Sequence, residues 1–329
     1  MKKVCVQGLG FVGAAMATSI AMARKDNQPI YNVFGIDLSS TIGKERIKKL
    51  NEGEFPFNTP DKSLHSAVKL NFKEKNFEAT SDTNHFADAD IIVVDIPLDI
   101  SYLDEDPKLD FSSFLESLSV ISDKIKKGCL LLIETTVPPG TCEEIIAPFL
   151  RDELGKREMG LEDIFLAHSY ERVMPGENYL ASIREYWRVF SGLDEHSALE
   201  CRKFLETIID TVNYPLTELK SMTASETAKV MENTYRAANI AFIDEWTKFA
   251  SSIQLDLIEI IEAIKIRSTH SNIMLPGLGV GGYCLTKDPT FAPAASKQIF
   301  KKEIQFPFSR LAVRVNNNMP LHVVQVLED

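Results

Sequence analysis

The chain has 329 residues, is 44% hydrophobic and 25% charged, and is therefore a globular protein too long for one hydrophobic core. Its net charge of -11 and pI near 5.2 oppose binding to phosphate backbones and anionic lipid, so nucleic acid and membrane surfaces are not expected partners. The five cysteines lack a C-x-x-C spacing, which argues against a disulfide framework and a structural zinc site. We expect a cytoplasmic, metal-free protein of two domains that acts on small molecules.

The first predicted element is a short strand, residues 4–7, followed by Gly8-x-Gly10-x-x-Gly13 and a helix that runs to about Arg24. Gly8 permits a tight turn, Gly10 lets a pyrophosphate approach the backbone, and Gly13 lets the helix pack against the strand. The helix N-terminus would then hold the phosphates. The alternatives are a glycine-rich turn without a ligand and a secretory signal peptide, and the fixed glycine spacing argues against the latter.

The next segments alternate between strand and helix. Residues 33–38 form a second predicted strand that ends in Asp37, whose carboxylate can accept the two hydroxyls of an adenosine ribose and so favours NAD over NADP. Residues 91–97 and 130–136 have the length and apolar character of buried strands, and the helix-like residues 111–127 lie between them. This alternation predicts an α/β fold with a Rossmann-type, doubly wound parallel sheet.

A long helix is predicted next. Residues 223–253 lack glycine and proline and carry apolar residues at alternating spacings of four and three, after a capping box of Thr223 and Glu226. A helix of about 30 residues is about 45 Å long, so we expect it to join two domains and to support a homodimer. The predicted domains are a Rossmann domain, residues 1–215, and an all-helical central domain, residues 216–329.

Two patterns in the second domain carry chemistry. Lys229 and Asn233 are four residues apart on one helix face, where both can reach one oxygen, although a surface pair without function has the same spacing. Cys284 ends the run PGLGVGGYC, whose bare backbone offers room and N–H donors, and Asp288 is near enough to handle protons. A dehydrogenase needs such a thiol when it oxidises an alcohol to an acid, because a thiohemiacetal retains the aldehyde. The alternative is a buried, hydrophobic cysteine.

These motifs resemble the UDP-glucose/GDP-mannose dehydrogenase family, which oxidises the C6 hydroxymethyl of a nucleotide sugar to a uronate with two NAD. The resemblance implies NAD as cofactor, a nucleotide sugar as substrate and a place in polysaccharide biosynthesis. It covers essentially the whole chain, through GLGFVG at 8–13, ETTVPPGT at 134–141, SYERVMPG at 169–176, ASETAKVMENTYRAANIAFIDE at 224–245 and PGLGVGGYCLTKDP at 276–289.

The resemblance also implies roles for single residues. Cys284 corresponds to the nucleophile, and Lys229 with Asn233 to the groups that stabilise oxyanions. Asp288 and Thr136 look like the pair that orders a water, and Glu171 like the acid/base for thioester hydrolysis. The implied cofactor-binding residues are Gly8, Gly10, Phe11, Val12, Gly13, Asp37, Pro97 and Thr136, and the implied substrate-binding residues are Glu171, Arg172, Lys229, Asn233, Arg267 and Gly281.

The chain departs from the family pattern in several places. Tyr170 precedes Glu171 where many members have proline, and Ile96-Pro97-Leu98-Asp99 stands where many have Val-Pro-Thr-Pro. The family also continues past the segment 314–320 into a C-terminal nucleotide-binding domain, which is absent from this chain. Because residues 321–329 have the pattern of a helix start, we expect the chain to be a truncated form of a longer protein.

Two other functions remain open. A β-hydroxyacid-type dehydrogenase also pairs a Rossmann domain with Lys-x-x-x-Asn on a helix, but it performs one oxidation and has no use for Cys284. A non-catalytic NAD-binding module is the alternative if the C-terminal domain is missing in the cell. The number of NADH formed per substrate separates the first from the family reaction, and nucleotide-sugar binding separates the second.

Overall fold

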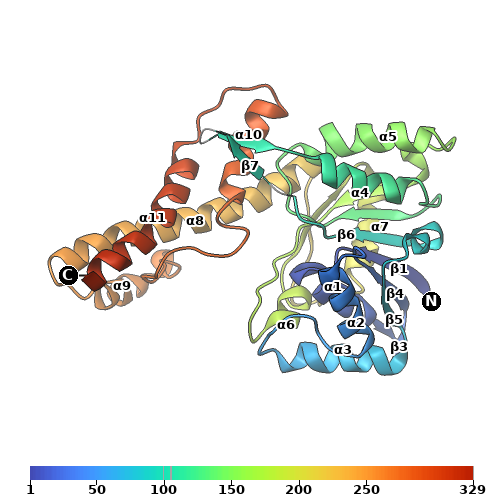
Figure 1. Cartoon of the computed structure of the whole chain (residues 1–329), viewed down its shortest axis with the longest axis horizontal. Helices are drawn as coiled ribbons and strands as arrows, with labels where there is room; N and C mark the ends of the chain where they lie inside the picture. The colour runs from blue at the N-terminus through green and yellow to red at the C-terminus, as the bar shows by residue number, and fades with distance from the viewer. Residues whose placement is uncertain (99, 104–105, 329) are drawn as a thin grey trace. The chain divides into compact units, whose positions relative to one another are not determined.

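The structure is a computed structural model that describes residues 1–98, 100–103 and 106–328 (Figure 1). Asp99, part of one departure from the family pattern, and Asp329, the end of the predicted second domain, lie outside the described residues. The predicted domain boundary at residue 215 stays a prediction, since compact units and sequence domains need not coincide. The first compact unit comprises Met1–Asp99, Asp110–Thr136 and Gly140–Glu226, and the second comprises Ile100–Leu109, Val137–Pro139 and Thr227–Asp329.

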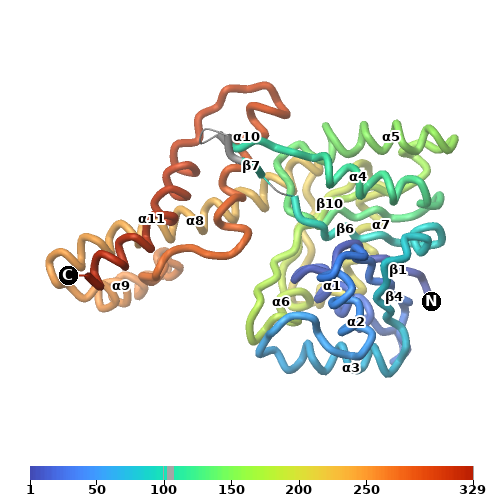
Figure 2. Tube along the Cα trace, in the orientation of Figure 1, coloured from blue at the N-terminus to red at the C-terminus, as the bar shows by residue number. Residues whose placement is uncertain are grey.

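The first unit is built on an eight-stranded sheet, counted over the described residues, in the order β12-β11-β10-β9-β6-β1-β4-β5 (Figure 2). Its pairs are parallel except for β10 with β11. Because the chain winds outward from β1 in both directions, the predicted Rossmann-type fold is confirmed. The strands are β1 Lys2–Gln7, β4 Tyr31–Ile36, β5 Phe77–Thr80, β6 Ile91–Val94, β9 Leu130–Ile133, β10 Phe165–His168, β11 Val189–Gly192 and β12 Thr217–Glu218, with a separate hairpin of β2 Arg24–Lys25 and β3 Gln28–Pro29.

Helices cover both faces of this sheet, which explains why β6 and β9 read as unbroken apolar runs (Figure 1). On one face, alternate strand residues such as Val93 and Leu132 share a hydrophobic core with α1 and α7. The opposite face carries α4 and α5. The helices of this unit are α1 Phe11–Ala21, α2 Thr41–Asn51, α3 Lys62–Glu74, α4 Ser112–Ser122, α5 Ala147–Gly155, α6 Tyr179–Arg184 and α7 Glu195–Leu205.

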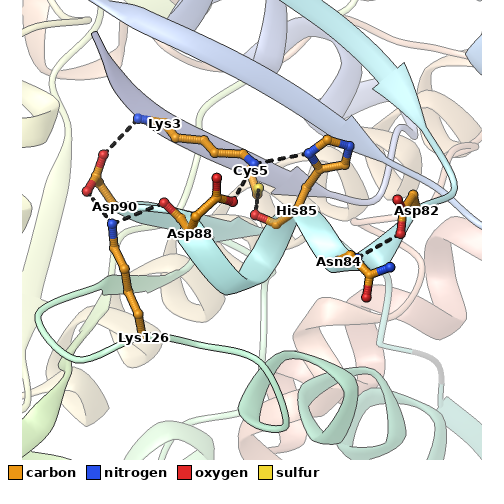
Figure 3. Close-up of polar contacts among 8 residues, drawn as sticks. All are labelled: Lys3, Cys5, Asp82, Asn84, His85, Asp88, Asp90 and Lys126. Carbon is orange, nitrogen blue, oxygen red and sulfur yellow. Dashed lines mark hydrogen bonds and ion pairs between the residues drawn. The ribbon is translucent and has the colours of Figure 1, made fainter.

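The amino edge of the sheet carries a set of paired charges, which we call the amino-edge cluster (Figure 3). Lys3 on β1 forms an ion pair with Asp88, and its Nζ lies 3.0 Å from Nδ1 of His85. Asp90, just before β6, lies 2.7 Å from Lys126 Nζ and accepts the Lys3 backbone N–H at 2.8 Å. Each carboxylate of the cluster therefore has a cationic partner.

The second unit is organised by α8, Met222–Ser252, the predicted long helix. With it are α9 Leu257–Lys265, α10 Phe291–Gln298 and α11 Pro307–Glu328. A hairpin of β7 Ile100–Leu103 and β8 Asp106–Leu109 also belongs to this unit, so the unit is not helical throughout. Gln298 on α10 holds the hairpin by donating to the Pro107 carbonyl at 2.6 Å. In the described part of the chain, no helix has the length and apolar character needed to cross a membrane.

The predicted capping box at the start of α8 is wrong. The Glu226 carboxylate accepts the backbone N–H groups of Gly140 at 2.6 Å and Cys142 at 2.7 Å, and Thr223 donates to Glu143 instead. These N–H groups open a π-helical turn, Cys142–Ile146, and need an acceptor from outside it. Burial is the main cause that raises the pKa of Glu226 to about 8.

The predicted helix start at residues 321–329 is also wrong. Residues 321–328 are the end of α11, which begins at Pro307 and continues through Pro320. Pro320 removes one N–H donor, but the helix persists because Ala312, Asn316 and Met319 are buried along one face. Asn316 anchors that face to α8 through a 3.0 Å hydrogen bond to the Ala237 carbonyl.

Candidate active site

The glycine turn between β1 and α1 has the shape that a dinucleotide needs. Gly8 has φ +95°, a left-handed conformation that favours glycine, and a Cβ there would lie 2.7 Å from the Asp95 carbonyl oxygen. A Cβ on Gly13 would lie 1.8 Å from the Gly8 carbonyl oxygen, whereas nothing lies within 4 Å of a Cβ on Gly10. The open side at Gly10 leads to the first turn of α1, where Phe11 and Val12 begin the helix. The turn therefore fits a pyrophosphate.

Asp37, the carboxylate predicted to bind the adenosine ribose, has a partner that the sequence analysis did not predict. Asp37 follows β4, and its Oδ2 lies 3.3 Å from Nη1 of Arg46 on α2. The Arg46 guanidinium also lies over the ring of Phe57 at 5.4 Å, and Phe57 stacks on the exposed Phe11 with ring centroids 4.0 Å apart. No motif indicated Arg46, because only the packing of α2 brings it to Asp37.

Two further cofactor-binding predictions fall on neighbouring strand ends. Pro97 follows β6 and Thr136 follows β9, and these strands are adjacent and parallel. Thr135 ties the two segments together, because its hydroxyl donates to the carbonyls of Val94 at 3.1 Å and Ile96 at 2.7 Å. The structure thus brings both segments to the carboxyl edge of the sheet, where open α/β sheets bind ligands.

Glu171 and Arg172 follow β10 at the same edge. Glu171 is buried and accepts the backbone N–H of Val173. Arg172 donates to the Trp187 carbonyl at 2.6 Å, and its guanidinium lies over the Tyr170 ring at 5.5 Å. The tyrosine that replaces the family's proline therefore supports Arg172, and a substrate group at this arginine would compete with the Trp187 carbonyl.

In the second unit, Lys229 and Asn233 on α8 are 6% and 9% exposed, which rules out the surface-pair alternative. Asn233 Nδ2 donates to Oδ2 of Asp288 at 2.7 Å, and Asp288 is itself buried. Burial raises the pKa of Asp288, while Lys287, Asn233 and Lys229 act in the opposite direction. A buried carboxyl next to a cation and an amide is a group that can hold or release a proton.

Cys284 belongs to the same set of residues. Its carbonyl accepts the backbone N–H of Lys287 at 3.1 Å and of Asp288 at 2.8 Å, so the thiol and the buried carboxyl share one turn of chain. Cys284 is exposed, as is the neighbouring Gly281, which excludes the buried-hydrophobe alternative. The other cysteines are buried: Cys5, Cys129, Cys142 and Cys201.

The structure adds Lys287 to this set. Lys287 Nζ lies 3.4 Å from Asp288 Oδ1. It also lies over two aromatic rings, 4.5 Å from the ring centroid of Tyr283 and 4.6 Å from that of Phe291. Its place beside Asp288 in the sequence was the one available signal. Arg267 is exposed and lies before a short 3-10 helix, Ser268–His270, and its predicted role in substrate binding stays a prediction.

The described residues contain no group of three or more His, Cys, Asp or Glu side chains placed to hold a metal ion. The first unit offers a dinucleotide turn, and the second offers a buried amide and carboxyl beside an exposed thiol.

Comparison with known proteins identifies the family of this chain. The profile of the "UDP-glucose/GDP-mannose dehydrogenase family, NAD binding domain" matches residues 2–210, and that of the family's central domain matches residues 223–318. With the Rossmann-type sheet and its glycine turn, these matches define an NAD-dependent oxidoreductase. The chain belongs to the UDP-glucose/GDP-mannose dehydrogenase family, as its motifs indicated, and the prediction of NAD as cofactor is confirmed.

Several relatives share one name. UDP-N-acetyl-D-mannosamine dehydrogenase of Methanocaldococcus jannaschii is 32% identical over 329 residues, which cover 99% of this chain and 68% of the relative. The Escherichia coli enzyme of that name is 29% identical, covering 98% and 70%. The solved structure of a UDP-D-ManNAc dehydrogenase from Pyrococcus horikoshii is 28% identical with a TM-score of 0.81, covering 99% of this chain and 70% of that one. The catalytic and binding roles of single residues stay predictions.

Proposed function

We propose that this chain supplies the catalytic residues for the oxidation of a nucleotide-sugar C6 hydroxymethyl to a carboxylate. In balance, one alcohol, two NAD and one water give one carboxylate, two NADH and three protons. The observation that carries the proposal is the 2.7 Å bond from Asn233 to the buried Asp288, in the same turn of chain as the exposed Cys284. A single alcohol oxidation has no use for that thiol.

The oxyanion is the first charge that the chain must stabilise. A water ordered by Asp288 and Thr136 takes the proton of the substrate hydroxyl and leaves an alkoxide. The Lys229 ammonium and Asn233 amide are on one helix face where both can donate to this oxyanion. NAD, when bound, accepts a hydride in each of the two oxidations. The aldehyde carbon is then attacked by the Cys284 thiolate, which forms the C–S bond of a thiohemiacetal whose oxyanion the same donors stabilise.

Thioester hydrolysis completes the reaction. The second oxidation converts the thiohemiacetal to a thioester, and water adds to its carbonyl carbon while the C–S bond breaks and the Cys284 sulfur leaves. Glu171 is proposed to take the proton of the attacking water, while Asp288 and Thr136 order the water that serves proton transfer from the substrate. The buried, amide-bonded carboxyl of Asp288 and the low exposure of Glu171 support these roles, because a carboxyl out of bulk water keeps a defined position.

For the substrate, we propose a UDP-N-acetylated hexosamine, with UDP-N-acetyl-D-mannosamine first. Support comes from the names of the relatives that are 32% and 29% identical over nearly the whole chain. A panel of UDP-N-acetyl-D-mannosamine, UDP-N-acetyl-D-glucosamine, UDP-glucose and GDP-mannose, offered to the full-length protein, ranks these candidates. Turnover of GDP-mannose above all the UDP sugars contradicts this assignment but leaves the reaction class intact.

The reaction class is tested by Cys284→Ser in the full-length protein. NAD binding should persist, because the glycine turn is untouched, while uronate formation should fall by several orders of magnitude, since a serine alkoxide is far harder to form than a thiolate of pKa about 8.5. The wild type should release two NADH per sugar and carry a substrate-sized adduct on Cys284 when quenched during turnover. Cys5→Ser is the control, since its hydroxyl can replace the thiol that donates to the His85 carbonyl at 3.3 Å. Undiminished uronate production by Cys284→Ser, or one NADH per sugar, favours the single-oxidation alternative.

We also propose a homodimer formed through α8 in a reducing compartment, the cytoplasm. Large apolar side chains of this helix remain exposed, among them Met231 at 67%, Phe242 at 52% and Phe249 at 51%. Burying them against a second copy would remove apolar surface from water. Sedimentation should give a dimer mass, and Phe242→Glu should shift it toward a monomer. The cytoplasmic location fits the free thiols, which include the exposed Cys284.

A further inference from the structure

Two acidic residues, Asp95 and Glu134, directly follow β6, which pairs with β1, and β9, which pairs with β6. Val94 on β6 and Ile133 on β9 are partners in register, so the residues that follow them, Asp95 and Glu134, are neighbours. Strand side chains alternate between faces, and Val93 and Leu132 point into the core under α1. Asp95 and Glu134 are each two residues further on and therefore lie on that same face, behind the glycine turn.

One cation reaches this pair. Arg188 directly precedes β11, and because β11 runs antiparallel to β10, its beginning lies at the carboxyl edge. Arg188 and Glu134 form a buried ion pair, and a second guanidinium nitrogen of Arg188 donates to the Tyr170 carbonyl at 3.1 Å. The single antiparallel step in the sheet thus places a guanidinium beside two carboxyls.

The negative charge of Asp95 and Glu134 exceeds the positive charge that acts on both of them. Asp95, Glu134 and Glu171 act on one another, while Arg188 is the guanidinium that acts on both members of the pair. Burial, then the Glu134 carboxylate, raise the pKa of Asp95 well above its ordinary value, and a hydrogen bond links the two carboxyl groups. Two carboxyl groups can form such a bond only when one of them carries a proton.

Arg172 is a second cation at this edge, next to Glu171 in the chain, whereas Tyr179 and Cys201 near the cluster are neutral at ordinary pH. Tyr179 on α6 is near Glu171, and burial raises the pKa of its phenol. Cys201 on α7 is near Arg188 and Glu134, and burial raises the pKa of its thiol. Helix α1, with the sequence FVGAAMATSIA, brings no ionisable side chain, so its contribution is the positive end of its dipole.

The acid pair is in direct contact with the glycine turn. The Asp95 backbone N–H donates to the Gln7 carbonyl at 2.8 Å, immediately before Gly8. The Asp95 carbonyl oxygen lies 2.7 Å from a Cβ built on Gly8, and the Asp95 Cβ lies 3.1 Å from one built on Gly13. The Asp95 Oδ2 atom is inaccessible to solvent. Any charge on Asp95 is therefore close to the phosphate-binding turn and is screened little by water.

We propose that Asp95 and Glu134 hold one shared proton, and that binding of a dinucleotide at the glycine turn stabilises this protonated form. The reason is electrostatic: a pyrophosphate at the turn adds negative charge beside the pair and makes loss of its proton less favourable. By linkage, the protein binds the dinucleotide more weakly once the pair has lost its proton, and binding takes up protons from solution. This inference concerns cofactor binding alone and does not depend on the role of Cys284.

The test is calorimetric titration of the wild-type chain with NAD between pH 6 and 9, in two buffers of different ionisation enthalpy. The buffer dependence of the heat counts the protons taken up, which should lie between zero and one. The Kd should rise with pH by at most tenfold per unit where the pair titrates. ADP-ribose should show at least the same uptake, because it has the pyrophosphate without the cationic nicotinamide. Binding of either ligand without proton uptake at every pH overturns the proposal.

Asp95→Asn supplies the matched variant. Its amide can donate to Glu134 without titrating, so the Kd for NAD should stay near the wild-type value at low pH and become independent of pH. The control is Asp244→Asn on α8, a buried acid whose pKa burial raises to about 6 but which is remote in sequence from the glycine turn. It should keep the wild-type pH dependence. Equal pH dependence in Asp95→Asn and the wild type contradicts the assignment to this pair.

Discussion

The two edges of the first unit's sheet differ in how their charged side chains are paired. At the amino edge, Lys3 pairs with Asp88 and Lys126 with Asp90, and these groups are partly in contact with water. At the carboxyl edge, Asp95 and Glu134 share one buried guanidinium, that of Arg188. Ion pairs that are balanced in charge and partly exposed to water contribute little to stability and require no further proton or ligand. Unbalanced acids out of water require a proton or a ligand, which marks the carboxyl edge as the functional one.

The largest expected difference between the edges is in stability. Arg188→Met should lower the free energy of unfolding by about 3–5 kcal/mol, because it leaves the buried Glu134 without its cation. Lys126→Met at the amino edge should lower it by at most about 1 kcal/mol, because Lys126 and Asp90 are both partly exposed. Urea unfolding at pH 7 measures both. Similar losses in the two variants would remove the distinction between the edges.

A smaller effect is expected at Asp37, a carboxyl-edge acid whose cationic partner is Arg46. NAD should bind at least tenfold more tightly than NADP, a gap of about 1.4 kcal/mol, because a 2′-phosphate would be repelled by the carboxylate. Arg46, 3.3 Å from Asp37, is the group that could attract that phosphate. Arg46→Ala should therefore widen the gap and Asp37→Asn should narrow it, as measured by fluorescence titration. Equal affinities of the wild type for both cofactors would sink the assignment of Asp37.

The smallest effect is the change of folding stability with pH, which has opposite signs at the two edges. Although partial burial opposes it, the hydrogen bonds from Lys126 and the Lys3 backbone lower the pKa of Asp90. Asp90 therefore contributes stability above its unfolded pKa of about 3.9, and this is lost as the pH falls through the lower folded pKa. Asp90→Asn should remove less than about 1 kcal/mol of that acid-dependent stability.

The carboxyl edge gives the opposite slope. The pKa of Asp95 is raised, so the folded chain binds more protons than the unfolded one, and stability declines as the pH rises above about 4. Asp95→Asn should flatten this decline, whereas Asp90→Asn should not affect it. Urea unfolding of the wild type and both variants from pH 3 to 8 separates the two contributions, and a change of slope of the same sign in both variants, relative to the wild type, would contradict the comparison.

Local chemistry made much of the fold predictable. The glycine spacing after β1 has one good physical explanation, since Gly8 has a positive φ and Gly13 has no room for a Cβ. Apolar runs without alternation predicted buried strands, and they occur at β6 and β9 although both strands end three residues before the predicted ends. The spacing in the segment 223–253 predicted α8 within one residue at each end.

The sequence by itself determined the order of strands and helices, the dinucleotide turn and the pairing of Lys229 with Asn233 on one face, because these depend on neighbours a few residues away. Tertiary structure alone decided which distant groups meet. The Glu226 carboxylate accepts the backbone N–H groups of Gly140 and Cys142 rather than capping its own helix, and Arg46 lies beside Asp37. The acid pair is the same case: Asp95 and Glu134 are far apart in the chain, and only the register of β6 with β9 makes them neighbours that share a proton.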